Sequence, residues 1–254
     1  MQVRLLGAHQ GASRDIAFMS LLVDGRLVID AGGLISALTL EEQEQIEAVL
    51  VTHKHYDHTK DLPGLAHSMW EIKSTVIYCI DDTRQALQDY YFNGVIWPRL
   101  VTVPKGFYPL IFHRVEPDQP FTLLGYDVTP IAVSHSVPTV GYLLEKEGRR
   151  VFYTADTRAE EDPIWTNLRP HLLIIETTMS SEHEERAYAV GHLTPLSLER
   201  VLAIFHRKQG YYPKIVCVHM NPAHEGRIKV EVEALARKLG ADITLGREGM
   251  VLEV

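Results

Sequence analysis

Leu50-Val51-Thr52-His53-Lys54-His55-Tyr56-Asp57-His58 is the segment that decides the fold and the chemistry of this chain. It begins with an apolar strand, and four potential metal ligands follow within six residues. In extended backbone His53 and His55 point to the same side, because side chains alternate with a period of two. One ion can bind both imidazoles, while Asp57 and His58 would face a second ion about 3.5–4 Å away. The segment therefore predicts a two-metal centre.

Three more candidate ligands occur where other apolar runs end. His135 follows Ile131-Ala132-Val133-Ser134, Asp156 follows the run from Val151 to Ala155, and His219 follows Ile215-Val216-Cys217-Val218. Two adjacent ions need more than four protein ligands, so we expect these residues to complete the centre.

Short runs of Val, Ile and Leu predict many strands, and helix signals lie between them. Thr39 begins a capping box, Pro195 follows Thr194 at the start of a second helix, and Gly240 ends a third that spans Glu231 to Leu239. The strands are predicted at residues 3–6, 20–23, 27–29, 48–52, 76–80, 128–133, 140–144, 151–154, 172–176, 215–219 and 243–245.

The order of these elements suggests a twofold pattern within one domain, residues 1–254. Each half, roughly 1–125 and 126–254, has successive strands followed by helices, and no linker-like composition separates the halves. Two such halves packed face to face give an α/β fold with four layers, helix/sheet/sheet/helix. Periodicity alone leaves a single doubly wound sheet open.

Composition describes a globular protein that does not favour polyanions. Of 254 residues 46% are hydrophobic and 23% charged, and the formal net charge is −8, which disfavours long nucleic acids as partners. Cys79 and Cys217 lie in apolar runs and are expected to be buried, reduced thiols. No stretch has the roughly 18 apolar residues of a membrane span, so we expect no membrane partner and a cytoplasmic location.

Over almost the whole chain, the sequence resembles the metallo-β-lactamase superfamily. The resemblance is carried by an ordered set of motifs: His-x-His-x-Asp-His, a distant His, Tyr153-Thr154-Ala155-Asp156-Thr157 and a late His. This resemblance implies the αββα four-layer sandwich. It also implies the ligand sets, with Asp156 bridging two ions: His53, His55 and His135 for one ion, and Asp57, His58 and His219 for the other.

Further segments are similar to the class II 3′,5′-cyclic-nucleotide phosphodiesterases and their bacterial relatives, and more distantly to ribonuclease Z. They are Ser134 to Leu143, Phe92 to Pro98, Ile175-Glu176-Thr177 and Gly191-His192-Leu193-Thr194. The resemblance implies hydrolysis of cyclic AMP or cyclic GMP to the 5′-nucleotide. Ribonuclease Z carries an arm that grips transfer RNA, whereas only 20 residues separate His135 from Asp156 here. We therefore expect no such arm.

Several residues receive roles in a hypothesis of catalysis. Two divalent ions, expected to be Zn²⁺ with Mn²⁺ or Fe²⁺ compatible, would activate a bridging hydroxide for attack on phosphorus. Asp57 favours phosphorus chemistry, His192 would protonate the leaving 3′ oxygen, and Glu176 would orient His192. Asp30 is either a hydrogen-bond partner of a ligand imidazole or a turn residue.

The remaining assignments leave alternatives open. Phe92, Asn93, Ile96 and Trp97 are candidates for contacts to the nucleobase, but an aromatic cluster also fits a core or a subunit interface, which leaves a homodimer open. Ala155 stands where the superfamily commonly has Gly, and ordinary backbone angles are expected there. His9 is expected at the surface rather than near the site. Other functions compatible with the motif are hydrolysis of a lactam, lactone or thioester, a nucleotide or metal sensor, and an iron redox enzyme.

Overall fold

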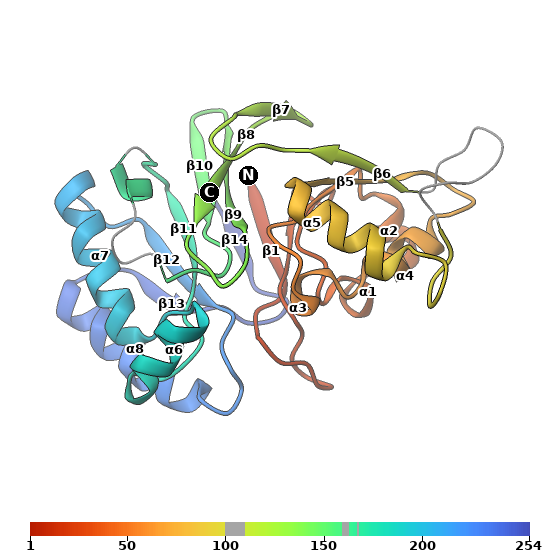
Figure 1. The fold of residues 1–254 in the computed structure, drawn as a ribbon. Coiled ribbons are helices and arrows are strands. Elements are labelled where there is room, and N and C mark those ends of the chain that lie inside the picture. Colours follow the sequence, from red (N-terminus) through yellow and green to blue (C-terminus); the bar gives the residue numbers. More distant parts are fainter. Residues whose placement is uncertain (100–109, 159–162, 167) are drawn as a thin grey trace.

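The computed structural model describes residues 1–99, 110–158, 163–166 and 168–254, which fold as two facing sheets with helices outside them (Figure 1). In this described part, seven strands form the first sheet in the order β14-β1-β2-β3-β4-β5-β6. Neighbours are antiparallel from β14 to β3 and parallel from β3 to β6. The bounds are β1 Gln2–Gly7, β2 Ser20–Val23, β3 Leu27–Ile29, β4 Ala48–Leu50, β5 Thr75–Cys79, β6 Leu110–Arg114 and β14 Val251–Glu253.

The second sheet repeats this arrangement, with the order β13-β12-β11-β10-β9-β8-β7. Its neighbours are antiparallel from β7 to β10 and parallel from β10 to β13. The bounds are β7 Phe121–Leu123, β8 Tyr126–Val133, β9 Thr139–Lys146, β10 Arg149–Tyr153, β11 Leu172–Glu176, β12 Lys214–Val218 and β13 Ile243–Leu245.

Helices cover the outer faces of the two sheets. In Figure 1 helices α6, α7 and α8 lie on one flank and α1, α2, α4 and α5 on the other, with both sheets between them. This arrangement confirms the predicted four-layer sandwich and excludes the single doubly wound sheet. The bounds are α1 Leu34–Ala37, α2 Leu40–Glu44, α3 Tyr56–Thr59, α4 Leu62–Ser68, α5 Asp81–Ala86, α6 Glu184–Val190, α7 Pro195–Gln209 and α8 Glu225–Leu239, with short η1 Leu87–Tyr91, η2 Pro163–Thr166 and η3 Ser181–His183.

The predicted helix signals act where the sequence places them. Thr39 and Glu42 form the reciprocal capping box of α2. Thr194 caps α7 and Pro195 occupies its first turn. Helix α8 ends at Gly240 as predicted but begins at Glu225, before the expected Glu231. No helix in the described ranges combines the length and the apolarity that crossing a bilayer requires.

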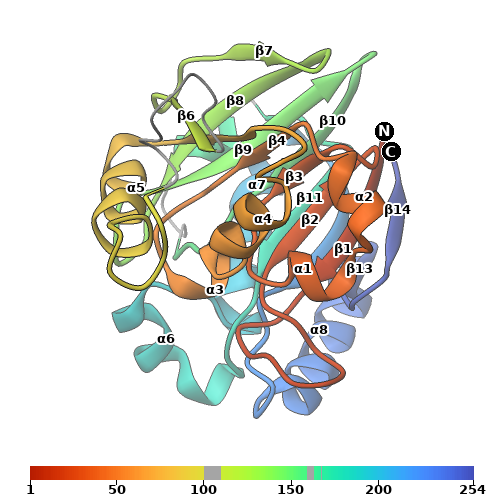
Figure 2. The ribbon, with the colours of Figure 1, turned by 90° about the vertical axis from the view of Figure 1, so that its right-hand side faces the viewer.

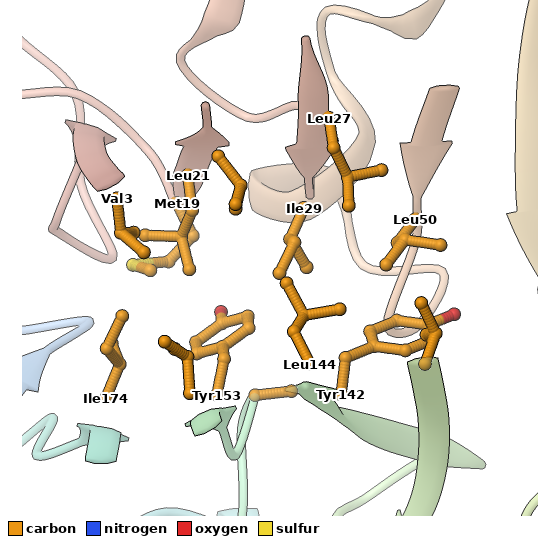
Figure 3. Close-up of a cluster of buried hydrophobic side chains, with 14 of the residues drawn as sticks. Val3, Met19, Leu21, Leu27, Ile29, Leu50, Tyr142, Leu144, Tyr153 and Ile174 are labelled. Atoms are coloured by element: carbon orange, nitrogen blue, oxygen red, sulfur yellow. The ribbon is translucent and has the colours of Figure 1, made fainter. Parts of the chain in front are cut away.

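Side chains from the two sheets meet in a shared core. Figure 3 shows Leu21, Leu27 and Ile29 of the first sheet facing Leu144 and Tyr153 of the second. Cys79 and Cys217 are free and buried, as predicted, and burial raises the pKa of each thiol to about 12. Apolar burial between the layers is the main force that holds the two halves together.

Three strands missing from the predicted set lie at sheet edges: β6, β7 and β14. The three-residue strands β7 and β14 each bury one side chain, Leu123 and Leu252, and leave little pattern in the sequence. Strand β6 does begin with apolar residues, Leu110-Ile111-Phe112, so it could have been predicted. Through β14 the end of the chain pairs with β1, and Figure 2 shows the two termini side by side.

Gly141 of β9 gives a test of how tightly the second sheet is built. A Cβ there would lie 2.6 Å from the backbone oxygen of Tyr153 and 2.9 Å from that of Thr154. We expect Gly141→Ala to lower the free energy of unfolding by about 1–3 kcal/mol, measured by urea denaturation. The matched control is Gly226→Ala in α8, where nothing lies within 4 Å, and it should leave stability unchanged or slightly higher. Equal stability of the two variants would contradict the described packing.

Candidate metal centre

The seven predicted ligands come from segments that follow strands of both sheets. His53 follows β4, while His135, Asp156 and His219 follow β8, β10 and β12. These three strands run in the same direction, because β9 is antiparallel to both β8 and β10 and the sheet continues in parallel to β12. Their carboxyl ends therefore meet at one edge, where α/β proteins place their sites.

The first group of side chains comprises His53, His55, His135 and Asp156. Nδ1 of His55 lies 3.0 Å from Nε2 of His53 and 3.3 Å from Nε2 of His135. Oδ2 of Asp156 is 3.6 Å from the first Nε2 and 3.7 Å from the second. A tetrahedral ion with bonds of about 2.0–2.1 Å separates its ligand atoms by about 3.3–3.4 Å. The spacing fits such an ion.

The second group comprises Asp57, His58 and His219, with Asp156 again beside it. Oδ2 of Asp57 lies 3.1 Å from Nε2 of His219 and 3.9 Å from Nε2 of His58. The other oxygen of Asp156, Oδ1, lies 3.3 Å from His58 Nε2 and 3.5 Å from His219 Nε2. Asp156 thus presents one carboxylate oxygen to each group.

Two buried polar atoms support the binding of cations here. Nε2 of His58 and Oδ1 of Asp156 are buried and have no hydrogen-bond partner. A buried polar atom without a partner is destabilising, and a coordinated cation would satisfy both atoms. Imidazole and carboxylate donors suit zinc and related divalent ions. The residues present therefore fit a metal centre.

In the first half of the chain, Asp30 fixes the orientation of two imidazoles of the predicted ligand set. Its carboxylate accepts hydrogen bonds from Nδ1 of His58 at 2.7 Å and from Oγ1 of Thr52 at 2.9 Å. Since the Thr52 hydroxyl donates to Asp30, it accepts from Nδ1 of His53 at 3.0 Å. This network assigns the proton to Nδ1 of both rings and leaves each Nε2 lone pair for a metal. Asp30 is a buried partner of the ligands, not a turn residue.

Glu176 has a similar role in the second half, where it orients one predicted ligand, His219. Its Oε2 accepts from Oγ1 of Thr178 at 2.7 Å, so Thr178 accepts in turn from Nδ1 of His219 at 2.8 Å. Nδ1 of His135 donates to the carbonyl of Gly191 at 2.9 Å. Sequence reasoning missed the two threonines; the signal available was a hydroxyl residue next to each motif.

His192 lies against the centre without belonging to the predicted ligand set. Its Nδ1 is bonded to Oε1 of Glu176 at 2.9 Å, and its ring stacks on His219 with centroids 5.2 Å apart. Burial would lower the pKa of His192, but the Glu176 carboxylate outweighs burial and raises the pKa to about 9. With Nδ1 engaged, the free nitrogen is Nε2.

The expectation of ordinary backbone angles at Ala155 is wrong. Ala155 has φ +57°, and Asp30 and His219 are also left-handed, at +59° and +62°. Each such residue costs about 1–2 kcal/mol in backbone strain. The turn after β10 directs Asp156 between the two groups, and a Gly at position 155 would adopt this φ without the strain.

The expectation that His9 lies at the surface is also wrong, because His9 is only 2% exposed. Its Nδ1 lies 2.8 Å from Oε1 of Glu248, which also accepts from the backbone N–H of Ala17. The neighbouring Ala8 carbonyl accepts from the backbone N–H of His219 at 2.6 Å. The early loop is therefore packed against the backbone of the predicted ligand His219 and supports it.

The candidate residues for nucleobase contacts do not form one stacking surface. Phe92 is 1% exposed and packs against Phe112, which fits the core alternative for this residue. Trp97 contacts His67, Nδ2 of Asn93 donates to the carbonyl of Asp89 in η1, and Ile96 is 86% exposed. Tyr91, which the sequence analysis did not single out, lies nearby. Its hydroxyl is 3.1 Å from Oγ1 of Thr59, the residue that follows His58 in the chain.

The family model described as "Beta-lactamase superfamily domain" matches residues 26–220, which contain all seven predicted ligands. The chain belongs to the β-lactamase superfamily. This result confirms the resemblance that the motifs indicate.

Members of the superfamily with curated names include both activities considered above. The chain is 23% identical over 225 residues to ribonuclease Z of Pyrococcus furiosus, covering 66% of this chain and 71% of that one. It is 25% identical over 188 residues to a probable 3′,5′-cyclic-nucleotide phosphodiesterase of Yersinia pestis, covering 66% and 53%. The match thus spans about half the length of the Yersinia protein.

Among solved structures, unliganded yeast PDE1 superposes with a TM-score of 0.83 at 18% identity, covering 100% of this chain and 99% of that chain. At this identity the similarity shows the shared fold alone. Sequence similarity therefore identifies the superfamily and leaves the substrate to the chemistry of the site.

Removing the charge of Asp30 tests its role beside the ligands. We expect Asp30→Asn to weaken metal binding 10–100-fold, because the amide cannot accept from both His58 and Thr52 as the carboxylate does. Equilibrium dialysis against a metal buffer measures the change. The control is Asp127→Asn, an exposed position on β8. Unchanged affinity in Asp30→Asn would show that the imidazoles are oriented without this residue.

Proposed function

We propose that the protein is a metal-dependent phosphodiesterase that hydrolyses 3′,5′-cyclic nucleotides to 5′-nucleotides. His53, His55 and His135 would bind one divalent ion, and Asp57, His58 and His219 a second, with Asp156 shared between them. Zn²⁺ is the expected metal, and Mn²⁺ or Fe²⁺ suits the same donors.

When bound, two such ions would polarise a phosphoryl oxygen as Lewis acids. They would also lower the pKa of a water molecule toward neutrality, so that hydroxide is available near neutral pH. The protein contributes the dry surroundings and the fixed directions of the donors. His53, His58 and Asp156 are each at most 1% exposed, so electrostatic interactions at the centre are weakly screened. Five imidazoles and two carboxylates would leave two divalent ions with a net positive charge, which suits a small monoanion.

The observation that carries this proposal is the position of His192 beside both Asp156 and His219, with its Nδ1 held by Glu176. Hydrolysis of a cyclic phosphodiester requires a proton for the departing 3′ oxygen. His192 can donate that proton from Nε2 while Glu176 stabilises the protonated imidazole. Glu176 in turn accepts from the backbone N–H groups of Thr157 and Leu193, so the pair is fixed in place.

The connection between two ligands favours a small substrate. His135 and Asp156 are joined by β9 and β10 through a tight turn at Glu147 and Gly148, both with positive φ. The whole connection lies in described residues and contains no additional arm. The net charge of −8 also opposes binding of a large RNA.

RNA hydrolysis of the ribonuclease Z kind is the second candidate. It is favoured by the Pyrococcus furiosus relative, whose alignment covers more of its own length than the Yersinia phosphodiesterase alignment does. The same centre also attacks carbonyl groups in principle, but the Glu176 and His192 pair and Asp57 favour phosphorus chemistry.

A substrate panel separates these functions. Purified protein with quantified metal is assayed with cyclic AMP, cyclic GMP, bis-(p-nitrophenyl) phosphate, a precursor transfer RNA, a chromogenic lactam and a thioester. We expect turnover of a cyclic nucleotide with release of the 5′-nucleotide. Cleavage of the precursor RNA without cyclic-nucleotide turnover would favour the second candidate, and turnover of only the lactam or thioester would overturn phosphodiester hydrolysis.

Replacing His192 tests the proton donor. We expect His192→Ala to lower kcat by ~10²–10⁴ while the metal content stays that of the wild type, the range of a positioned general acid. Bis-(p-nitrophenyl) phosphate, whose leaving group needs little protonation, should lose much less activity. The matched control is His206→Ala, at the last turn of α7. A loss below about threefold on the cyclic nucleotide would remove His192 from the mechanism.

A further inference from the structure

A second cluster of potential ligands lies outside the residues used above. Glu182 and His183 end the short helix η3, and His224 precedes α8. A ligand atom of each lies within 4.8 Å of the other two. Nε2 of His183 is 3.7 Å from Oε1 of Glu182, and the two imidazole rings meet edge to face with centroids 4.5 Å apart. Two segments 41 residues apart thus bring two imidazoles and a carboxylate together.

Ser180 is buried beside the cluster and orients two of its side chains. Its hydroxyl lies 3.2 Å from Oε1 of Glu182 and 3.1 Å from Nδ1 of His224, so it contacts ligands from both segments. Ser180 itself is fully buried. This is the device found at the main centre, where Thr52 and Thr178 each join a carboxylate to the Nδ1 of an imidazole.

The backbone around the cluster is also held in place. The N–H of Ser181 donates to Oε2 of Glu231 at 2.9 Å, and the N–H of Asn221 donates to the carbonyl of Thr178 at 2.9 Å. The N–H of His224 donates to the carbonyl of Asn221. The two loops that carry the cluster are therefore joined to each other before any ligand binds, which reduces the entropy lost on binding.

The charge and chemistry of the cluster suit a cation. A single His–Glu ion pair needs one imidazole, whereas here two face one carboxylate, and two protonated rings at this distance would repel each other. The first turns of α6 and α8, which follow the cluster residues in the chain, carry Glu184, Glu185 and Glu225. Glu184 pairs with Arg200, and Glu225 lies 3.6 Å from His9 Nε2. Two imidazoles and one carboxylate are ligands typical of zinc, and partial exposure leaves room for water at the remaining positions.

We propose that Glu182, His183 and His224 form a further metal site that binds Zn²⁺ or a similar transition-metal cation. An ion there would join the loop after β11 to the loop after β12. Those loops also carry Thr178 and His219, so the ion would act as a structural clamp behind the centre. The proposal rests on residues that the proposed hydrolysis does not use.

The test is a count of zinc per chain. Wild-type protein and the variants His183→Ala and His224→Ala are equilibrated with buffered free zinc, and bound zinc is measured by mass spectrometry. We expect each variant to bind one equivalent less than the wild type, whatever number the main centre holds. His206→Ala serves as the control and should bind the wild-type number. Far-UV circular dichroism verifies that each variant is folded.

Crystals of the wild type grown with zinc provide the second measurement. Anomalous scattering at the zinc edge should show a peak between the side chains of His183 and His224, distinct from any peak at Asp156. Equal zinc counts in wild type and both variants, or an equal loss in His206→Ala, would overturn the proposal. The test compares the number of bound zinc ions between the wild type and the variants. It therefore gives an answer even if the main centre binds no zinc or hydrolyses no phosphodiester.

Discussion

The hydrogen bond at Nδ1 of four of the five predicted ligand imidazoles is the interaction on which the centre depends. His53, His58, His135 and His219 each have Nδ1 occupied by a protein oxygen, so Nε2 is the atom left to point inward. An imidazole in the other tautomer would present a proton, and not a lone pair, to a metal. Asp30, Thr52 and Thr178 follow strands within one or two residues, and the carbonyl of Gly191 lies at the end of α6, so the fold of both halves determines the chemistry of the centre.

The two halves of the chain solve this problem in the same way. Asp30 reaches His53 through Thr52 and binds His58 directly; Glu176 reaches His219 through Thr178 and binds His192 directly. The difference between the halves lies in the directly bound imidazole. His58 faces Asp156 from within a predicted ligand group, whereas His192 stands beside the groups. Each half thus has the same arrangement of a carboxylate, a threonine and two imidazoles. We infer that this difference leaves His192 of the second half available as a proton donor.

The candidate ligands could be predicted from the sequence, because polar residues that end apolar strands can be recognised without a structure. His135, Asp156 and His219 each stop a strand, and the structure brings them together with the motif at His53. The backbone at Ala155 was not predictable in this way, since a left-handed alanine arises from the turn that the tertiary structure imposes after β10. Thr52 and Thr178 look like ordinary strand-end residues until their partners are known. Burial of His9 depends on Glu248, which lies 239 residues away.

The proposed function requires that two neighbouring cations bind between the halves and share Asp156. The most direct measurement is anomalous diffraction from crystals grown with zinc, collected on both sides of the zinc absorption edge. Shared binding predicts two peaks at a separation of about 3.5–4 Å, one beside each carboxylate oxygen of Asp156. Saturating zinc with no peak beside Asp156, and with His53, His58 and His219 turned away from one another, would contradict it.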